Sequence, residues 1–179
     1  NLDNGLGGTQ TEENKGLTDK GIEVIKWIYE RPMILDVSHM SKQTFWDTLD
    51  LASGTVIASH ANSRALCNHP RNLDDDQILA LAERGGVVGL VFSQAFVNGG
   101  SETKDLNRLI EHAWYIADLA GVEVLAIGTD LGGIDDPIPE VAGVDRFNVL
   151  VEALEKEFGS DTPKILGENS IRALRTSLV

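Results

Sequence analysis

The sequence predicts an α/β fold with parallel strands, and two observations carry that prediction. Short apolar runs of the kind found in buried strands alternate with longer segments whose apolar residues recur at helical spacing. Strands separated by helices pair in parallel, because each connection crosses back over the sheet before the next strand begins. Four such strand–helix units form either a small open sheet or about half of an eight-stranded barrel, and composition does not choose between them.

The helices are predicted from caps and apolar stripes, and the strands from short apolar runs between turn residues. Thr18 and Ser41 are typical N-cap residues, and Pro32 stops the first helix. The aspartates at 74–76 suit the positive end of a third helix, which closes at Gly85. The predicted order is helix 18–30, strand 33–37, helix 41–54, strand 55–58, helix 73–85, strand 87–92, helix 105–120, strand 124–127, and helices 145–157 and 163–175.

The composition is that of a globular chain. Its 179 residues, 42% of them hydrophobic and 24% charged, are enough to bury a core, and we expect residues 1–179 to form a single domain segment. The net charge of −13 argues against binding to nucleic acid or to anionic membrane surfaces, because Lys and Arg must neutralise the negative charge of either partner. The sequence contains no run of 18 or more apolar residues, which predicts no membrane span.

Cysteine use and the start of the chain bear on its cellular compartment. Cys67 is the single cysteine, which excludes an intrachain disulfide and a cysteine-based zinc site. This fits a reducing compartment, and we expect a cytoplasmic protein. The chain begins without Met, and residues 1–14 are unlike a signal peptide. We therefore expect a start that is processed, trimmed or incomplete.

Three of the four predicted strands end on a residue that can bind metal, namely His39, His60 and Asp130. In parallel α/β folds the carboxyl ends of the strands share one face, where active sites assemble. Neighbouring strands lie about 5 Å apart, so imidazoles at the same level on adjacent strands can converge on one ion. A single His after a strand is more often a hydrogen-bonded loop residue. Two in the same Ser-His context at successive strand ends leave ligation and that alternative about equally favoured.

The loop that follows the second histidine supplies further candidates. Arg71 can hold a substrate carboxylate through two parallel hydrogen bonds, or it can pair at the surface with the aspartates at 74–76, and the sequence leaves both open. His69 is a further candidate ligand, although a loop His beside Pro is more often structural. His112 lies inside a predicted helix, where we expect it either to pack or to face solvent.

Several short motifs occur in a fixed order along most of the chain. They are Gly16-Leu-Thr18, Asp36-Val-Ser-His-Met-Ser41, Ala58-Ser-His-Ala-Asn-Ser-Arg64, His69-Pro-Arg-Asn-Leu-Asp-Asp75, Gly85-Gly-Val-Val-Gly89, Gly128-Thr-Asp130 and Gly167-Glu-Asn169. In this order and at these intervals they resemble the membrane dipeptidase (renal dipeptidase) family of zinc metallopeptidases, family M19. The chain resembles the C-terminal half of those proteins.

The resemblance implies a fold, a cofactor and roles for particular residues. The fold would be the C-terminal portion, about the last four βα units, of a (β/α)8 TIM barrel of the metal-dependent hydrolase type, with two zinc ions at its mouth. The resemblance implies that His39 and His60 ligate one of these zincs. It also implies that Arg71 and Asn72 bind the substrate, with the arginine on its terminal carboxylate, and that Asp130 handles the proton during hydrolysis.

Two departures from the family pattern matter. The family's last motif resembles Gly-Ser-Asp-Phe-Asp-Gly, whereas residues 128–133 are Gly-Thr-Asp-Leu-Gly-Gly, so Gly132 replaces the second aspartate. The family's His-x-Asp pair, its metal-bridging Glu and a substrate-binding His lie upstream of the match and outside this sequence. We therefore expect the rest of the barrel to come from an N-terminal part of the same protein or from a companion chain.

On this basis the sequence predicts zinc-dependent hydrolysis of dipeptides. Two alternatives stay open. One is another metal-dependent amidohydrolase, such as a deaminase or lactonase, and the other is a non-catalytic half-barrel that acts as a subunit. A homodimer also stays open.

Overall fold

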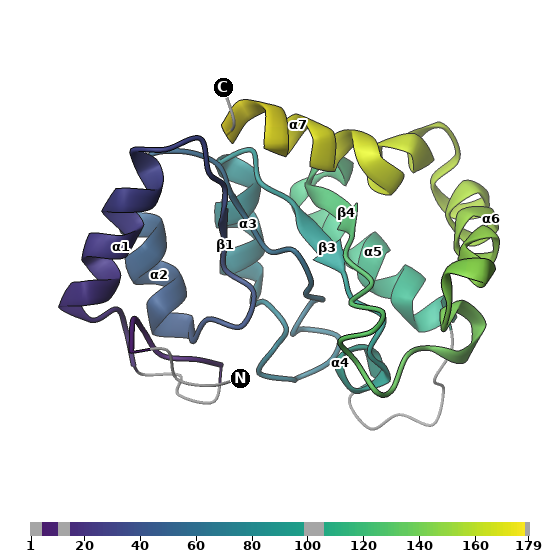
Figure 1. Ribbon diagram of the computed structural model, residues 1–179. Coiled ribbons are helices and arrows are strands. Elements are labelled where there is room, and N and C mark those ends of the chain that lie inside the picture. Colours follow the sequence, from purple (N-terminus) through teal and green to yellow (C-terminus); the bar gives the residue numbers. More distant parts are fainter. Residues whose placement is uncertain (1–4, 11–14, 99–105, 178–179) are drawn as a thin grey trace.

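In the part of the chain that the structure describes, four short parallel strands lie in the middle and helices connect them (Figure 1). The computed structural model describes residues 5–10, 15–98 and 106–177. The strands are β1 (Leu35–Asp36), β2 (Val56–Ile57), β3 (Val88–Leu90) and β4 (Leu125–Ile127). β1 pairs with β2 and β3 pairs with β4, both in parallel, and a parallel bridge between Ala58 and Val88 joins the two pairs. The strand order is therefore β1-β2-β3-β4, as expected for successive βα units.

The helices begin where their caps predict. Thr18 caps α1 by accepting a hydrogen bond from the backbone of Gly21, and Ser41 caps α2 in the same way. Asp74 and Gln77 form a capping box at the start of α3. The helices are α1 (Asp19–Tyr29), α2 (Lys42–Leu51), α3 (Asp75–Glu83), α4 (Gln94–Asn98), α5 (Leu106–Ala120), α6 (Phe147–Phe158) and α7 (Asn169–Ser177).

The structure departs from the predicted elements in several places. The helix predicted over 163–175 is a π-helix over Lys164–Glu168, and α7 begins only at Asn169. The short helix α4 was not predicted, and a 3-10 turn over Val122–Val124 occupies the start of the fourth predicted strand. The observed strands are shorter than the predicted apolar runs. An apolar run shows which residues are buried, whereas the hydrogen bonding between strands stops where the backbone turns. Directly after β1, for example, the backbone N–H of Met40 donates to Val37 in a turn. The predicted first residue of α5, Asp105, lies outside the described residues.

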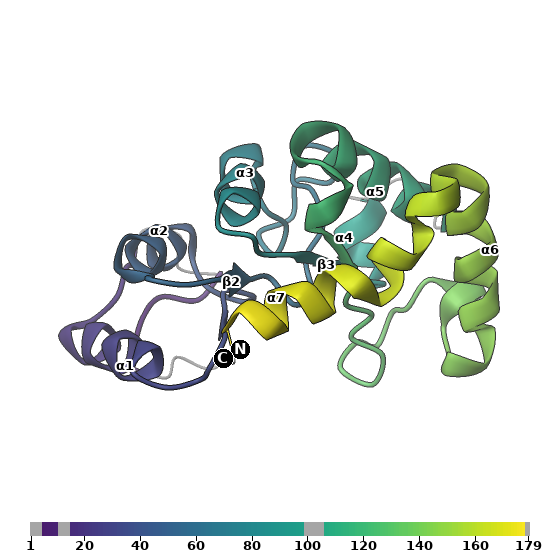
Figure 2. The same cartoon turned by 90° about the horizontal axis from the view of Figure 1, so that it is seen from above.

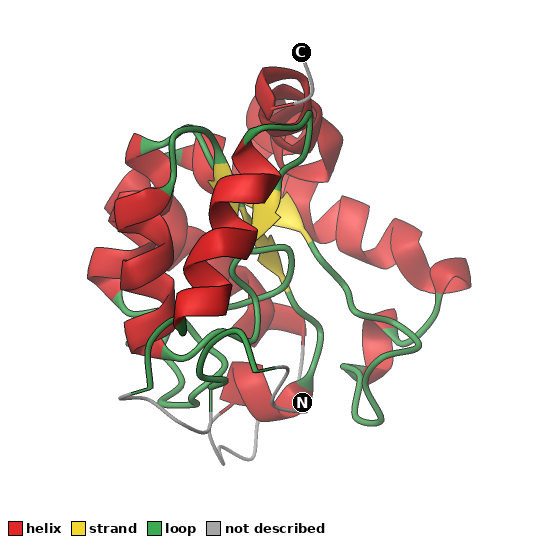
Figure 3. Cartoon of the chain, turned by 60° about the vertical axis from the view of Figure 1, so that its left-hand side comes forward, coloured by secondary structure: helices red, strands yellow, loops and turns green. Residues whose placement is uncertain are grey.

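The strands run between the helices (Figures 2 and 3), and buried side chains pack against both of their faces. On one face Val56, Val88 and Leu125 pack into the main core beneath α2, α3 and α5. On the other face Val87 and Ala126 pack against Ala173 of α7. Successive residues of a strand point to opposite faces, so each strand contributes side chains to both layers.

α7 is tied to the amino ends of the strands, which leaves their carboxyl ends to the loops. The Asn169 side chain donates to the backbone carbonyls of Val122 and Leu125, at 2.9 and 2.8 Å. Arg172 donates to the carbonyls of Gly85 and Glu123. Among the described residues, no helix is both long enough and apolar enough to cross a membrane.

Candidate active site

His39 and His60 meet beyond the carboxyl ends of β1 and β2. Their Nε2 atoms lie 2.7 Å apart, and their ring centroids lie 4.8 Å apart with the planes inclined at 63°. Strand register causes this contact: Asp36 pairs with Ile57, and each histidine follows its strand residue by three positions. The structure therefore brings together the two histidines that the Ser-His motifs singled out.

Backbone strain occurs at two of the candidate site residues. In the described part of the chain, the non-glycine residues with positive φ are His39, at +72°, and Asp130, at +57°. A left-handed backbone costs a non-glycine residue about 1–2 kcal/mol. Such strain persists only where the surroundings hold it, and it gathers at functional sites. Both residues lie just beyond strand ends, on the face where the sequence placed the site.

Asp36 ties the two Ser-His turns together. Its Oδ1 atom accepts hydrogen bonds from the backbone N–H groups of Ser38 and Ser59, at 3.0 and 2.9 Å, and its Oδ2 atom accepts from the Ser59 hydroxyl at 2.5 Å. The Ser38 hydroxyl accepts from the backbone N–H of His60 at 3.1 Å. The Ser59 hydroxyl lies 2.7 Å from Nδ1 of the His60 ring. Sequence reasoning missed Asp36 and Ser59, although an acidic residue at the strand end just before a Ser-His motif was a visible signal.

Burial and nearby charge keep both imidazoles neutral. Burial is the largest cause that lowers the pKa of His39, from 6.5 to about 4, and the positive charge of Arg71 lowers it further. Burial and Arg71, in that order, also lower the pKa of His60. The negative charges of Asp130 and Asp36 act in the opposite direction on both rings. Because only a neutral imidazole can offer a lone pair to a metal, this environment favours ligation near neutral pH.

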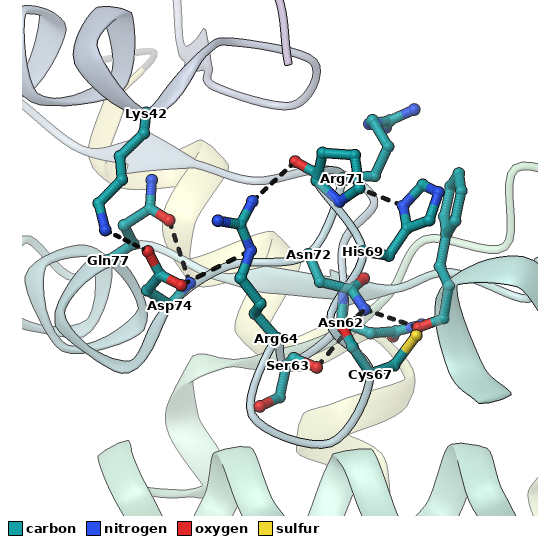
Figure 4. A network of polar contacts seen from close by, with 12 residues as sticks. Lys42, Asn62, Ser63, Arg64, Cys67, His69, Arg71, Asn72, Asp74 and Gln77 are labelled. Atoms are coloured by element: carbon teal, nitrogen blue, oxygen red, sulfur yellow. Dashed lines mark hydrogen bonds and ion pairs between the residues drawn. The ribbon is translucent and has the colours of Figure 1, made fainter. Parts of the chain in front are cut away.

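Arg71 is the cation of this cluster. Burial lowers its pKa below the usual value, and its Nε and Nη2 atoms are buried without a hydrogen-bond partner in the described structure. The alternative that Arg71 pairs with the aspartates at 74–76 has no support, because Lys42 and Arg64 pair with Asp74 instead, at 2.5 and 3.6 Å (Figure 4). The guanidinium therefore keeps hydrogen-bond donors unused beside the two histidines.

Two aromatic rings lie close to the arginine and its loop. Phe96, on the unpredicted helix α4, lies 5.2 Å from the Arg71 guanidinium carbon and 4.4 Å from the centre of the His69 ring. His69 accepts a hydrogen bond from the backbone N–H of Arg71 through Nδ1, at 3.2 Å. His69 therefore contacts the backbone of the Arg71 loop through its ring. Sequence reasoning missed Phe96 because its contact with the loop is not local.

Asn72 is buried inside the same loop (Figure 4). Its side chain is 2% exposed. The amide donates to the backbone carbonyls of Cys67 and Phe96, at 2.9 and 2.7 Å, and its oxygen accepts from the backbone N–H of Asn62. These bonds occupy both ends of the amide and join the Arg71 loop to α4. The expected contact between Asn72 and a substrate stays a prediction. In this structure the side chain forms hydrogen bonds with backbone groups.

Asp130 lies in a tight turn after β4. Gly133 donates its backbone N–H to the Asp130 carbonyl at 2.9 Å, and a Cβ atom at Gly133 would lie 2.2 Å from the Asp130 carboxylate. A side chain at position 133 would therefore displace the Asp130 carboxylate from its present place. Gly132, which replaces the family's second aspartate, has φ of +91° and no neighbouring atom within 4 Å of where a Cβ would be.

The third strand contributes to the scaffold of the site. Ser93 follows β3 and donates its hydroxyl to Asp136 at 2.9 Å, which fastens the loop after β4 to the end of β3. His112, on α5, is fully buried and bonds to Ser63 and Val97. The structure therefore places His112 in the packing and not in solvent.

The two imidazoles fit part of a zinc site. Imidazole nitrogen is a common zinc ligand, and protein sites use three or four ligands. Across the described ranges, no group of three or more His, Cys, Asp or Glu side chains is placed to hold an ion. Two ligands of one tetrahedral ion stand about 3.3 Å apart, so an ion would take the place of the 2.7 Å contact between the rings. Two histidines are fewer than the three or four protein ligands of a zinc site, so in the described structure the pair fits only part of such a site.

Known proteins with similar sequences point to one family. The profile of the membrane dipeptidase family (peptidase family M19) matches residues 4–178. An uncharacterized protein from the pqqA 5′ region of Klebsiella pneumoniae is 38% identical over 166 residues, which are 89% of this chain and 60% of the relative. An uncharacterized dipeptidase of Schizosaccharomyces pombe is 28% identical over 167 residues, covering 92% of this chain and 41% of the relative.

Solved structures agree on the fold. The crystal structure of the dipeptidase AC, a family M19 metallopeptidase, superposes with a TM-score of 0.85 at 26% identity, covering 91% of this chain and 49% of that one. A Rhodobacter sphaeroides metallopeptidase liganded with a phosphinate mimic of the dipeptide L-Ala-D-Ala gives a TM-score of 0.82 at 27% identity, over 90% and 47%. The prediction of a partial barrel is confirmed. The chain spans about half the length of these relatives, and with its match over residues 4–178 it belongs to the membrane dipeptidase family, peptidase family M19.

Proposed function

We propose that the protein hydrolyses dipeptides at a zinc centre to which this chain contributes His39 and His60. The observation that carries the proposal is the approach of their Nε2 atoms to 2.7 Å beside Arg71 and Asp130, whose charges act on both rings. Membership of the membrane dipeptidase family supports it. So does the dipeptide mimic bound by the Rhodobacter sphaeroides relative.

The chain's own residues prepare the site for this chemistry. Zinc, when bound, supplies a water acidic enough to ionise near pH 7 and polarises the scissile carbonyl. Burial keeps His39 and His60 neutral, so each ring has a lone pair to offer. Asp130 accepts a proton from the attacking water and passes it to the leaving amine. Its backbone has a positive φ in the turn after β4, and the absence of a Cβ at Gly133 leaves room for its carboxylate.

Arg71 recognises the free carboxylate of the substrate. Its unused Nε and Nη2 donors match the two oxygens of a carboxylate in a bidentate pair. A fixed cation close to the reacting groups accepts short peptides, because a longer chain would place its carboxylate beyond reach. Asn72 holds the loop that presents the arginine, through its bonds to Cys67 and Phe96.

The remaining ligands would come from the rest of a barrel. A hollow of about 450 Å³ opens beside β1, and Asp36, Ser38 and His39 form part of its wall. Among the described strands β1 has a single neighbour, β2, so its outer edge offers free backbone groups to a further strand. We propose that an upstream part of the protein, or a companion chain, fills this side and completes the metal site.

The test of the proposal is the Asp130→Asn variant of the full-length protein. It should keep its zinc, measured as bound metal per chain, and lose hydrolysis of dipeptides by about 100-fold or more, because general acid–base catalysis contributes about 10²–10⁴-fold. Asp135→Asn is the matched control, since it removes the same charge from an exposed position of the same loop. Full hydrolysis by a zinc-loaded Asp130→Asn protein would refute the role given to Asp130.

A substrate panel separates the proposal from its rivals. The zinc-loaded protein should hydrolyse dipeptides faster than cyclic amides or lactones. A preference for lactones or cyclic amides would instead favour another amidohydrolase. A full-length protein without bound metal or activity would favour a subunit without catalysis.

A further inference from the structure

We propose that Asp36 is a positioning residue that sets the tautomer of His60 through the Ser59 hydroxyl. In this relay the His60 Nδ1 atom carries the ring hydrogen, and the Nε2 atom presents a lone pair at the place where the two histidines converge. The inference deepens the proposed function, because a metal centre is what the lone pair would serve. The tautomer itself is a property of this chain and can be measured without metal.

The first step is the orientation of the Asp36 carboxylate. The backbone N–H groups of Ser38 and Ser59 both donate to its Oδ1 atom, at 3.0 and 2.9 Å. These two donors lie on turns that follow different strands, and together they hold the Oδ1 atom in place. The Oδ2 atom is thereby directed at the Ser59 hydroxyl, at 2.5 Å.

The second step counts the protons of the Ser59 hydroxyl. This group has one hydrogen to donate and two lone pairs. Its neighbours are the Asp36 Oδ2 atom at 2.5 Å, the His60 Nδ1 atom at 2.7 Å and the Ser38 hydroxyl at 3.3 Å. The carboxylate can only accept, so the short contact takes the hydroxyl hydrogen. The contact to His60 then forms only if Nδ1 is the donor.

The third step follows from the chemistry of a neutral imidazole. One ring nitrogen carries the hydrogen and the other has the lone pair. With the hydrogen of His60 on Nδ1, its lone pair is on Nε2, which faces His39 at 2.7 Å. In the metal-free chain His39 is therefore the donor across that contact. Partners that fix the tautomer of a ligating histidine contribute substantially to metal affinity.

The same geometry makes Asp36→Asn a reversal of the relay. The two backbone N–H donors require an oxygen at the Oδ1 position, so the NH₂ group of the new amide must occupy the Oδ2 position. That group donates to the Ser59 hydroxyl, which then donates its own hydrogen to Nδ1 of His60. The ring must carry its hydrogen on Nε2, and the lone pair no longer faces His39.

The direct measurement is the tautomer of His60 by ¹⁵N NMR of the full-length protein after metal is removed with a chelator. The unchanged protein should show His60 protonated on Nδ1, and the Asp36→Asn variant should show it protonated on Nε2. Asp50→Asn, which removes a charge from an exposed position on α2, should leave the tautomer unchanged. The same His60 tautomer in the unchanged protein and in Asp36→Asn would overturn the inference.

Zinc affinity tests whether the relay acts through Ser59. Zinc alone, competed against a chelating indicator, should bind Asp36→Asn about 10- to 100-fold more weakly than the unchanged protein. Adding Ser59→Ala to Asp36→Asn removes the reversed donor and should recover part of the loss. Strictly additive effects of the two substitutions would refute the relay and leave Asp36 with only a direct charge effect.

The two proposals fail in different ways. If the full-length protein bound no zinc, the proposed function would fail, whereas the NMR result on His60 would still decide the relay. If zinc bound and the tautomer did not change in Asp36→Asn, the relay would fail and the proposed function would stand.

Discussion

The fully buried His112 should make this protein acid-sensitive in a way that one substitution removes. The backbone N–H of Ser63 donates to its Nδ1 atom at 3.1 Å, and its Nε2 atom lies 2.9 Å from the carbonyl of Val97. The ring therefore uses Nδ1 as acceptor and Nε2–H as donor, which is the pattern of a neutral imidazole. A second proton on Nδ1 would break the bond from Ser63. The perturbation is His112→Gln, which removes the titration and keeps an amide donor within reach of Val97.

The magnitude follows from the pKa of His112. Burial lowers it from 6.5 to about 4, against a smaller opposing effect of the bond to Val97. The unfolded chain therefore holds the proton more tightly than the folded chain. The stability gained from the neutral ring is fully present above pH 6.5 and is lost as the pH falls toward 4. With these two pKa values the loss reaches about 2 kcal/mol at pH 5.

The assay is urea unfolding of the unchanged protein and of His112→Gln at pH 8 and at pH 5. The unchanged protein should lose about 2 kcal/mol more of its unfolding free energy between these pH values than the variant does. The carboxylates and the other histidines titrate in both proteins, so their contributions cancel in the difference. Equal losses in the two proteins would refute the argument, because they would mean that His112 binds its proton equally well in the folded and unfolded states.

Three further predictions concern the site and its loops. Arg71→Lys should weaken kcat/KM for dipeptides by about 10- to 100-fold through loss of the bidentate pair, and an unchanged ratio between dipeptides and dipeptide amides would contradict this role. Asn72→Ala should lower the unfolding free energy by about 1–3 kcal/mol in urea, because it leaves buried carbonyls without donors; no change would contradict the buried network. Gly133→Ala should reduce kcat, because the new Cβ displaces the Asp130 carboxylate. Gly167→Ala is its control, because a Cβ at that position meets no atom within 4 Å. Equal kcat values in the two variants would contradict the packing argument.

The helix caps show what local sequence can predict. Thr18 and Ser41 cap their helices because a cap depends on residues three positions apart, which the sequence displays directly. The strand ends were predictable for a similar reason: an apolar run that stops at Ser-His marks where a buried strand reaches the surface. The helix α4 was missed, because five residues with little periodicity give a weak pattern.

The sequence by itself determined the order of the βα units, the strand-end positions of His39, His60 and Asp130, and the resemblance that names a family. Only the tertiary structure decided what the neighbours of these residues do. In the structure Asn72 is buried and bonds to backbone carbonyls, and Asp74 pairs with Lys42 and not with Arg71. Asp36 accepts a hydrogen bond from the Ser59 hydroxyl, which lies 23 positions further along the chain. The reason is physical: helix caps and alternation are local, whereas hydrogen bonds between loops depend on strand register and on how helices pack, which the sequence encodes only through the whole fold.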